Sequence, residues 1–151
     1  MCWWCREPSV ALATTTTLGG IIAGAGTSMA ADGTLSALGT AIVNLASGAN
    51  VALDLTPIVQ GAPEILFNLP IGAGVATVVS ITNPPAAGIL AEFVLVVHNS
   101  AGSAITWPST MRWPQGLAPS LSAADGKQDT FVIYTQDGGA SYDAFVAGQG
   151  Q

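Results

Sequence analysis

Two cysteines near the amino terminus have the spacing of a redox or metal-binding pair. Cys2 and Cys5 enclose two tryptophans in a Cys-Trp-Trp-Cys run. A redox pair usually lies where a strand leads into a helix, and that context is absent here. A zinc site usually has four ligands, whereas the one histidine, His98, lies far along the chain. We therefore predict no metal and no cofactor, and we interpret Trp3 and Trp4 as apolar contacts of an attachment arm. Metal or redox chemistry and a loose terminus are the alternatives.

Carboxylates late in the chain are the other candidates for chemistry. They are Asp125, Asp129, Asp137 and Asp143. Paired carboxylates can hydrolyse glycosidic bonds, and clustered ones can bind calcium. However, Asp125-Gly126 and Asp137-Gly138 are ordinary turn pairs, no EF-hand spacing is present, and no nucleophile motif accompanies His98. We predict that the chain is not an enzyme, with a calcium site or a polysaccharide depolymerase as the alternatives.

The charge balance excludes two classes of partner. Only 8% of the 151 residues are charged, against about a quarter in an average soluble domain, and the net charge is −6. Arg6, Arg112 and Lys127 are too scattered to neutralise a nucleic acid or an anionic membrane. Because exposed apolar surface usually marks an interaction site, we expect copies of the chain or a larger assembly to cover much of the surface.

No stretch reads as a membrane span or a secretory signal. Glycines interrupt the uncharged run at 8–31, and prolines interrupt the uncharged run at 65–91. The start of the chain lacks a basic region followed by an apolar run. We therefore expect the protein to be made and assembled in a cytoplasm.

The second half of the chain has the pattern of β-strands divided by turns. The expected strands are 51–55, 64–69, 77–82, 92–98, 104–107, 130–135 and 141–146. Asp137-Gly138-Gly139 predicts a hairpin between the last two, since glycine accepts the positive φ of tight turns. No tandem repeat of fixed period is visible. The pattern predicts an all-β fold, with an antiparallel β-sandwich or jelly-roll-like C-terminal domain.

The first half of the chain is rich in small residues. Between Pro8 and Pro63 the charged side chains are Asp32 and Asp54 alone. Short β pieces punctuated by glycine fit this composition, with a helix over 35–45 as the alternative. Such pieces gain stability when they wind against equivalent segments of other subunits. We expect an extended, glycine-rich N-terminal region, with an attachment arm at 1–12, an intertwined β segment at 13–63 and the β-sandwich domain at 64–151.

A repeated tryptophan–proline pair is the most distinctive local motif. In Trp107-Pro108 and Trp113-Pro114, each proline stops strand continuation and each indole offers a large apolar face with one N–H donor. We predict that both rings pack in the interior or at a subunit interface, with sugar stacking on a receptor-binding surface as the alternative. The candidate residues for this aromatic surface or interface are Trp107, Trp113, Tyr134 and Tyr142.

The order of these motifs resembles a known family. The chain reads Thr82-Asn83-Pro84-Pro85-Ala86-Ala87-Gly88, Glu92-Phe93-Val94-Leu95, Asn99, the two tryptophan–proline pairs, Gly116-Leu117-Ala118-Pro119-Ser120-Leu121, Gly126-Lys127-Gln128-Asp129 and Thr135-Gln136-Asp137-Gly138-Gly139. Over about residues 77–148 this order resembles the C-terminal domain of phage tail-fibre and virion-surface proteins. Runs 13–20 and 31–36 are similar to short units of trimeric phage fibres that interleave between three chains, which implies a homotrimer.

The chain also departs from that family. Such fibres often end in Trp-Tyr-Gly-Phe, whereas this chain has Ser141-Tyr142-Asp143-Ala144-Phe145. The departure puts a ligand-binding role of the final hairpin in doubt. The chain is also very short for a tail fibre and has no long shaft.

These features together predict a bacteriophage structural protein that is located in the virion. We expect a trimeric capsid decoration protein that stabilises the head surface, whose partners are its own copies and the major capsid protein or another virion protein. The expected capsid contacts of the arm are Cys2, Trp3, Trp4, Arg6 and Leu12. The alternative is a short tail-fibre or receptor-binding tip, for which a host-surface polysaccharide would be the partner.

Overall fold

The computed structural model describes residues 27–29 and 35–151, and the chain divides into two compact units. In the first unit, Met1–Leu38, the described part is an antiparallel pair of strands, β1 (Thr27–Met29) and β2 (Leu35–Ala37). The second unit is Gly39–Gln151. The arm expected at 1–12 lies outside the described residues, and the boundary expected between residues 63 and 64 falls inside the second unit.

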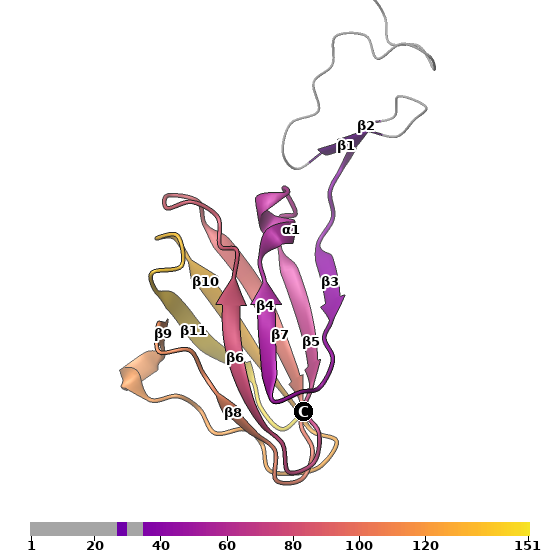
Figure 1. The fold of residues 1–151 in the computed structure, drawn as a ribbon, viewed down its shortest axis with the longest axis vertical. Coiled ribbons are helices and arrows are strands. Elements are labelled where there is room, and N and C mark those ends of the chain that lie inside the picture. The colour runs from indigo at the N-terminus through magenta and orange to yellow at the C-terminus, as the bar shows by residue number, and fades with distance from the viewer. Residues whose placement is uncertain (1–26, 30–34) are drawn as a thin grey trace, which may run out of the picture. The chain divides into compact units, whose positions relative to one another are not determined.

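The second unit winds its chain back and forth between two sheets (Figure 1). One sheet contains the parallel strands β3 (Ala41–Asn44), β5 (Ile65–Pro70) and β7 (Ala91–His98). The other contains the parallel strands β4 (Asn50–Asp54), β6 (Ala76–Thr82) and β8 (Ala104–Thr106). Because successive strands alternate between the sheets, each pair forms one coil of a β-solenoid-like arrangement. A single helical turn, α1 (Thr56–Val59), joins β4 to β5.

Three further strands extend the first sheet to six. They are β9 (Met111–Arg112), β10 (Gln128–Thr135) and β11 (Tyr142–Gly148). β10 lies antiparallel to β7 and β11 lies antiparallel to β10, whereas the short β9 is parallel to β11. The strand order is therefore β3-β5-β7-β10-β11-β9, against β4-β6-β8 in the smaller sheet. A 3-10 turn, η1 (Pro114–Gly116), follows β9.

Glycines set the corners at which the coils turn from the larger sheet into the smaller one. The corners are 45–49, 71–75 and 99–103, and β4, β6 and β8 each begin two residues after a glycine. These glycines are Gly48, Gly74 and Gly102. The last two have φ values of +67° and +69°, and a Cβ on Gly102 would lie 3.6 Å from the Gly74 Cα. The corners thus stack closely, which keeps successive coils in register.

The core lies between the two sheets. Phe67 of β5, Phe93 of β7 and Phe131 of β10 are fully buried, together with Leu53 and Leu55 from the β4 side. Burial of each such side chain contributes about 1.5–3 kcal/mol, so the aliphatic and aromatic rows that face inward hold the coils together. Alternation along each strand, as in β7, turns every second side chain outward.

The all-β class is confirmed, but the antiparallel sandwich or jelly roll is wrong, because most strand pairs are parallel and belong to stacked coils. All seven expected strands exist, as does the hairpin at Asp137–Gly139. The helix considered at 35–45 is wrong, since that segment holds β2 and β3. Its β-branched residues favour extended backbone, and Gly39 weakens a helix.

Candidate functional site

The outer face of the six-stranded sheet carries an unbroken row of apolar side chains. The register places one residue from each of five strands in this row, in the order Ile42, Leu66, Val94, Val132 and Phe145. The adjacent residues Ile65 and Phe93 are fully buried and face the core. Because side chains alternate along a strand, the row faces away from the core. We refer to these five residues as the outer row.

The two ends of the outer row are its most exposed members. Ile42 is 67% exposed and Phe145 is 45% exposed, while the three residues between them are partly buried. Among the described strands, β3 has no neighbour on its outer side, and β9 pairs only with Tyr142 and Asp143, short of Phe145. The Tyr134 ring stacks on Phe145 with ring centroids 6.1 Å apart. Such exposed apolar surface is typical of an interaction site.

Polar pairs flank the outer row on both sides. Toward the glycine corners, the Asn68 side chain donates a hydrogen bond of 2.9 Å to the Asn44 side chain on the next strand. Toward the opposite end, Arg112 donates two hydrogen bonds to Asp143, at 2.9 and 2.8 Å. Both pairs are exposed and contribute little stability. Among the described strands, none covers the apolar row that lies between them.

The outer face of the three-stranded sheet is different in character. Its outward residues are small or polar on β4 and β8: Asn50, Ala52, Asp54, Ala104 and Thr106. The central strand β6 adds one large apolar side chain, Val78, which is 47% exposed. Outward apolar surface is therefore concentrated on the larger sheet.

Trp107 and Trp113 lie side by side within the second unit. Their ring centroids are 5.0 Å apart, and both rings meet Phe131 edge-on, at 5.0 and 5.7 Å. The smaller sheet ends at β8, so these indoles provide apolar packing for β10 where no strand of that sheet continues. Each edge-to-face pair adds about 0.5–1.5 kcal/mol to the burial of area. Neither indole N–H has an acceptor among the described residues.

A buried aspartate ties three distant segments to the sheet. Asp129 on β10 accepts hydrogen bonds from the backbone and side chain of Ser122, both at 2.6 Å, from the Gly150 backbone at 2.9 Å and from the Asn99 side chain at 2.9 Å. Burial alone would raise the pKa of Asp129, but these bonds outweigh it and lower the pKa. Its carboxylate therefore serves as a structural clamp.

Two further aspartates are engaged in turns. Hydrogen bonds from Thr56 and then Asn83 lower the pKa of Asp54. In the β10–β11 hairpin, the side chain and backbone of Ser141 lower the pKa of Asp137 to about 2. An acid with a lowered pKa is ionised at neutral pH and cannot serve there as a general acid.

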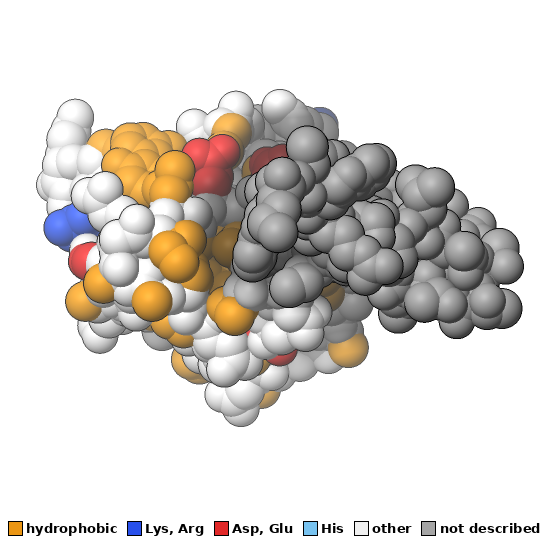
Figure 2. Space-filling view, turned by 90° about the horizontal axis from the view of Figure 1, so that it is seen from above, with side chains coloured by type: hydrophobic (Ala, Val, Ile, Leu, Met, Phe, Trp, Pro, Cys, Tyr) orange, Lys and Arg blue, Asp and Glu red, His pale blue; other side chains and the backbone are white. Residues whose placement is uncertain are grey.

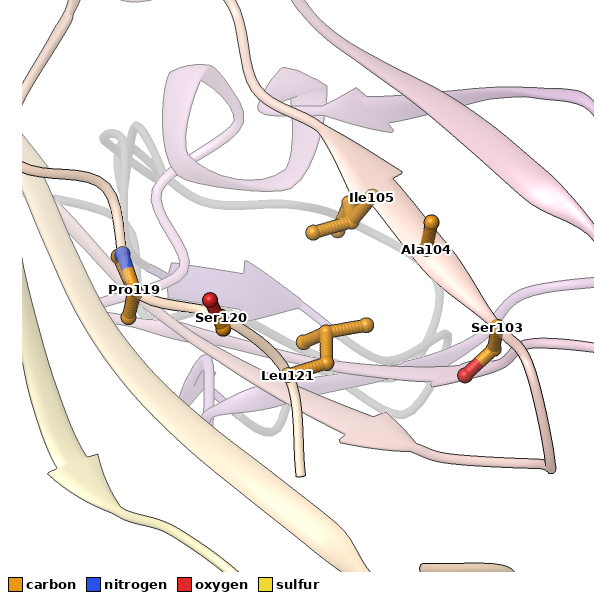
Figure 3. A pocket seen from close by; sticks show the side chains of 6 residues that line it. All are labelled: Ser103, Ala104, Ile105, Pro119, Ser120 and Leu121. Carbon is orange, nitrogen blue, oxygen red and sulfur yellow. The ribbon is translucent and has the colours of Figure 1, made fainter. Parts of the chain in front are cut away.

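A cavity of about 300 Å³ lies beside the edge strand β8. Its lining residues are Ser103, Ala104, Ile105, Pro119, Ser120 and Leu121. Ile105 and Leu121 extend toward it from its two sides (Figure 3). The lining has two hydroxyl groups and no ionisable side chain, so we assign no catalytic role to this cavity.

The other chemical candidates do not converge on a site. His98 is exposed at the end of β7. Among the described residues, no group of three or more His, Cys, Asp or Glu side chains is placed to hold a metal ion. Within residues 27–29 and 35–151, no helix is long and apolar enough to cross a membrane.

The structure places the predicted site residues in different settings. Tyr142 is buried against Phe93, with ring centroids 6.4 Å apart, whereas Tyr134 lies on the outer face of the sheet. The expected arm contacts, Cys2, Trp3, Trp4, Arg6 and Leu12, lie outside the described residues.

Sequence reasoning missed the outer row. The sequence pattern that could have indicated it is the run over 93–97, where Val94 and Val96 alternate with buried side chains, so that this part of β7 is apolar on both faces.

Seen from the end of the unit in Figure 2, the described surface carries orange apolar groups among white ones, with few red or blue groups.

Comparison with known proteins does not extend this description. The chain matches no protein-family model, no curated protein and no solved structure.

Proposed function

We propose that the chain is a non-catalytic structural protein of a bacteriophage particle, that it works as a homotrimer, and that it decorates the capsid surface. The outer row is the observation that carries this proposal. An unbroken apolar row that ends in strongly exposed Ile42 and Phe145 needs a partner, and only 8% of the chain is charged. The motif order over residues 77–148, which resembles phage virion-surface proteins, supports the class of assembly.

The chemistry of the described residues favours a structural role over an enzymatic one. Asp54, Asp129 and Asp137 have lowered pKa values because turn and loop donors bind them. These carboxylates are therefore committed to holding the fold. The cavity beside β8 has no ionisable lining residue.

Decoration would stabilise the head by linking neighbouring capsid subunits. A ligand that binds only the assembled state shifts the equilibrium toward that state. Three modest contacts held in one trimer bind far more tightly than one alone, provided that all three can engage at once. The residues of the N-terminal arm, 1–12, would make these contacts with the major capsid protein.

The test uses the purified full-length protein and capsids that lack it. We expect a trimeric mass in solution, binding to those capsids, and a higher temperature of capsid opening when the protein is bound. A variant without residues 1–12 should keep the trimeric mass and lose the binding. A monomeric protein that leaves the opening temperature unchanged would refute the proposal.

A receptor-binding tip is the second candidate, and the stacked pair of Tyr134 and Phe145 favours it. Aromatic faces beside a charged pair such as Arg112 and Asp143 are suited to sugars, whose C–H faces stack on rings and whose hydroxyls bond to charged groups. A trimer that ignores capsids and binds host-surface polysaccharide would support this candidate. Loss of that binding in Tyr134→Ala would assign the binding surface.

A further inference from the structure

The cavity beside β8 opens on the unpaired edge of a sheet. β8 is the last strand in the order β4-β6-β8, so among the described strands one side of it has no neighbour. On its paired side, the Ala104 backbone N–H donates a hydrogen bond of 3.0 Å to the carbonyl of Val75, next to β6. Because the backbone groups of successive strand residues point to opposite sides, the N–H and C=O of Ile105 point to the open side, where Ile105 lines the cavity.

The opposite wall of the cavity is a chain segment that does not pair with β8. Residues 119–121 form this wall, and Leu121 and Ile105 extend into the space from its two sides (Figure 3). The Ser120 carbonyl accepts a hydrogen bond of 2.8 Å from the Gln149 side chain, and the buried aspartate clamp holds the residue that follows the wall. Among the described residues, no backbone hydrogen bond joins the wall to β8. The wall is therefore anchored elsewhere and leaves the edge of β8 open.

The chemistry of the lining excludes several classes of ligand. It has no ionisable side chain, so a charged ligand would lose its hydration without gaining a counter-charge. It has no aromatic ring on which a sugar or a base could stack. It offers one backbone donor and one backbone acceptor at Ile105, two serine hydroxyls, and the apolar side chains of Ile105 and Leu121. An extended peptide matches this set, because its backbone supplies the complementary acceptor and donor and its side chains fill the apolar part.

We infer that this cavity binds a short, extended and uncharged peptide segment of a partner protein, which adds a fourth strand to the smaller sheet along the outer edge of β8. The segment bonds to the Ile105 backbone and places one side chain between Ile105 and Leu121. In strand addition of this kind, main-chain bonds supply affinity and the side-chain pocket supplies specificity. A cavity of about 300 Å³ is at the lower end of ligand sites, which suits a small side chain. The site goes beyond the proposed decoration role, because neither the trimer nor the N-terminal arm uses it.

Hydrogen exchange at single amides of the full-length protein tests the inference. The probes are three capped, uncharged peptides, acetyl-Thr-Xaa-Thr-Xaa-Thr-amide with Ala, Val or Leu at Xaa. In the free protein, the Ile105 amide should exchange at least about tenfold faster than the Ala104 amide, whose bond to Val75 protects it. At millimolar concentration, at least one probe should slow exchange at Ile105 by about tenfold or more and leave Ala104 unchanged. An Ile105 amide that is already protected in the free protein, or one that none of the probes slows, would overturn the inference.

Methylated probes and a proline variant distinguish strand pairing from simple adhesion to an apolar pocket. The same peptides with methylated backbone amides keep their side chains but lose their donors, so they should bind the wild type at least about tenfold more weakly. Ile105→Pro removes the outward N–H and spares the bonds to β6, since proline is tolerated on the open side of an edge strand, and it should weaken peptide binding about as much.

Ile105→Val is the matched control, because it keeps the backbone donor, and its affinity for the probes should stay within about threefold of the wild type. Far-ultraviolet circular dichroism should show that both variants keep their strands. Equal affinity for methylated and unmethylated probes, or full binding by a folded Ile105→Pro, would overturn strand addition. The methylated probes need no variant, so they decide the question where Ile105→Pro does not fold.

Discussion

Four aspartates of the described residues, Asp54, Asp129, Asp137 and Asp143, accept hydrogen bonds that fix local structure. Asp137 illustrates the point, because two hydrogen bonds from Ser141 and one from Thr135 close the hairpin turn around its carboxylate. Sequence inspection correctly recognised the turn from Asp137-Gly138-Gly139. It could not identify Asp129 as a buried clamp, because its partners Asn99 and Gly150 are distant in sequence and meet only in the folded chain.

Asp137 gives the protein a predictable sensitivity to acid. Its folded pKa is about 2, below the ordinary value of 3.8, so the folded state binds its proton less readily than the unfolded state does. The contribution of ionised Asp137 to the stability of the folded state is complete well above pH 3.8 and is lost as the pH falls through about 2. In Asp137→Asn, the decline of the melting temperature between pH 4 and pH 2 should be shallower than in the wild type. Ser141→Ala, which removes the main donor, should flatten the decline in the same direction, and unchanged slopes in both variants would contradict this assignment.

At the scale of elements, the hairpin turn and the loop before β7 hold each other in place. A Cβ on Gly138 would lie 3.2 Å from the Ala87 backbone nitrogen, and a Cβ on Gly139 would lie 2.5 Å from the Tyr142 hydroxyl oxygen and 2.8 Å from Pro84 Cγ. The two segments that carry the most recognisable sequence motifs therefore pack directly on one another. Their glycines are required by this close approach as well as by their positive φ values.

Alanine substitutions of Gly139 and Gly126 should separate the cost of steric overlap from the cost of a positive φ in a residue with a Cβ. Gly139 has a φ of +82°, and Gly126 has a φ of +74° with nothing within 4 Å of a built Cβ. Gly126→Ala should lower the free energy of unfolding by about 1–2 kcal/mol through backbone strain alone. Gly139→Ala should lower it by about 3 kcal/mol, since the contacts with the Tyr142 hydroxyl and Pro84 add an overpacking cost. Urea titration of both variants measures the difference, and equal losses would show that the contacts with Tyr142 and Pro84 relax at no cost.

The strands could be predicted from the sequence, but their winding could not. Local runs such as 77–82 and 92–98 specify extended backbone, whereas parallel and antiparallel pairing use the same residue types. The available signal was the corner glycines, Gly48, Gly74 and Gly102, each two residues before a strand. The register offset is 24 residues between β3 and β5 and 28 residues in the three other parallel pairs, so a 28-residue period exists but spans too few coils to stand out in the sequence.

The whole second unit combines a solenoid with a closing hairpin, and this combination determines how it should unfold. Long solenoids can unfold coil by coil, because each repeat touches only its neighbours. Here β7 pairs with β5 of the preceding coil on one side and with β10 of the hairpin on the other, and Phe67, Phe93 and Phe131 lie in one buried cluster. The coils and the hairpin therefore share a core that neither can bury alone.

We accordingly expect the second unit to unfold in a single transition. Phe67→Ala in the middle coil and Phe131→Ala in the hairpin should each lower its free energy of unfolding by about 3–5 kcal/mol, because each leaves a large cavity in the same core. The exposed Leu117→Ala, at a side chain 72% open to solvent, should change it by less than about 0.5 kcal/mol. In a Trp3→Phe, Trp4→Phe background, fluorescence reports on Trp107 and Trp113 beside the hairpin, while circular dichroism reports on all strands. Coincident urea transitions from both probes in every variant would establish one cooperative unit, and an earlier fluorescence transition in Phe131→Ala alone would show that the hairpin opens independently of the coils.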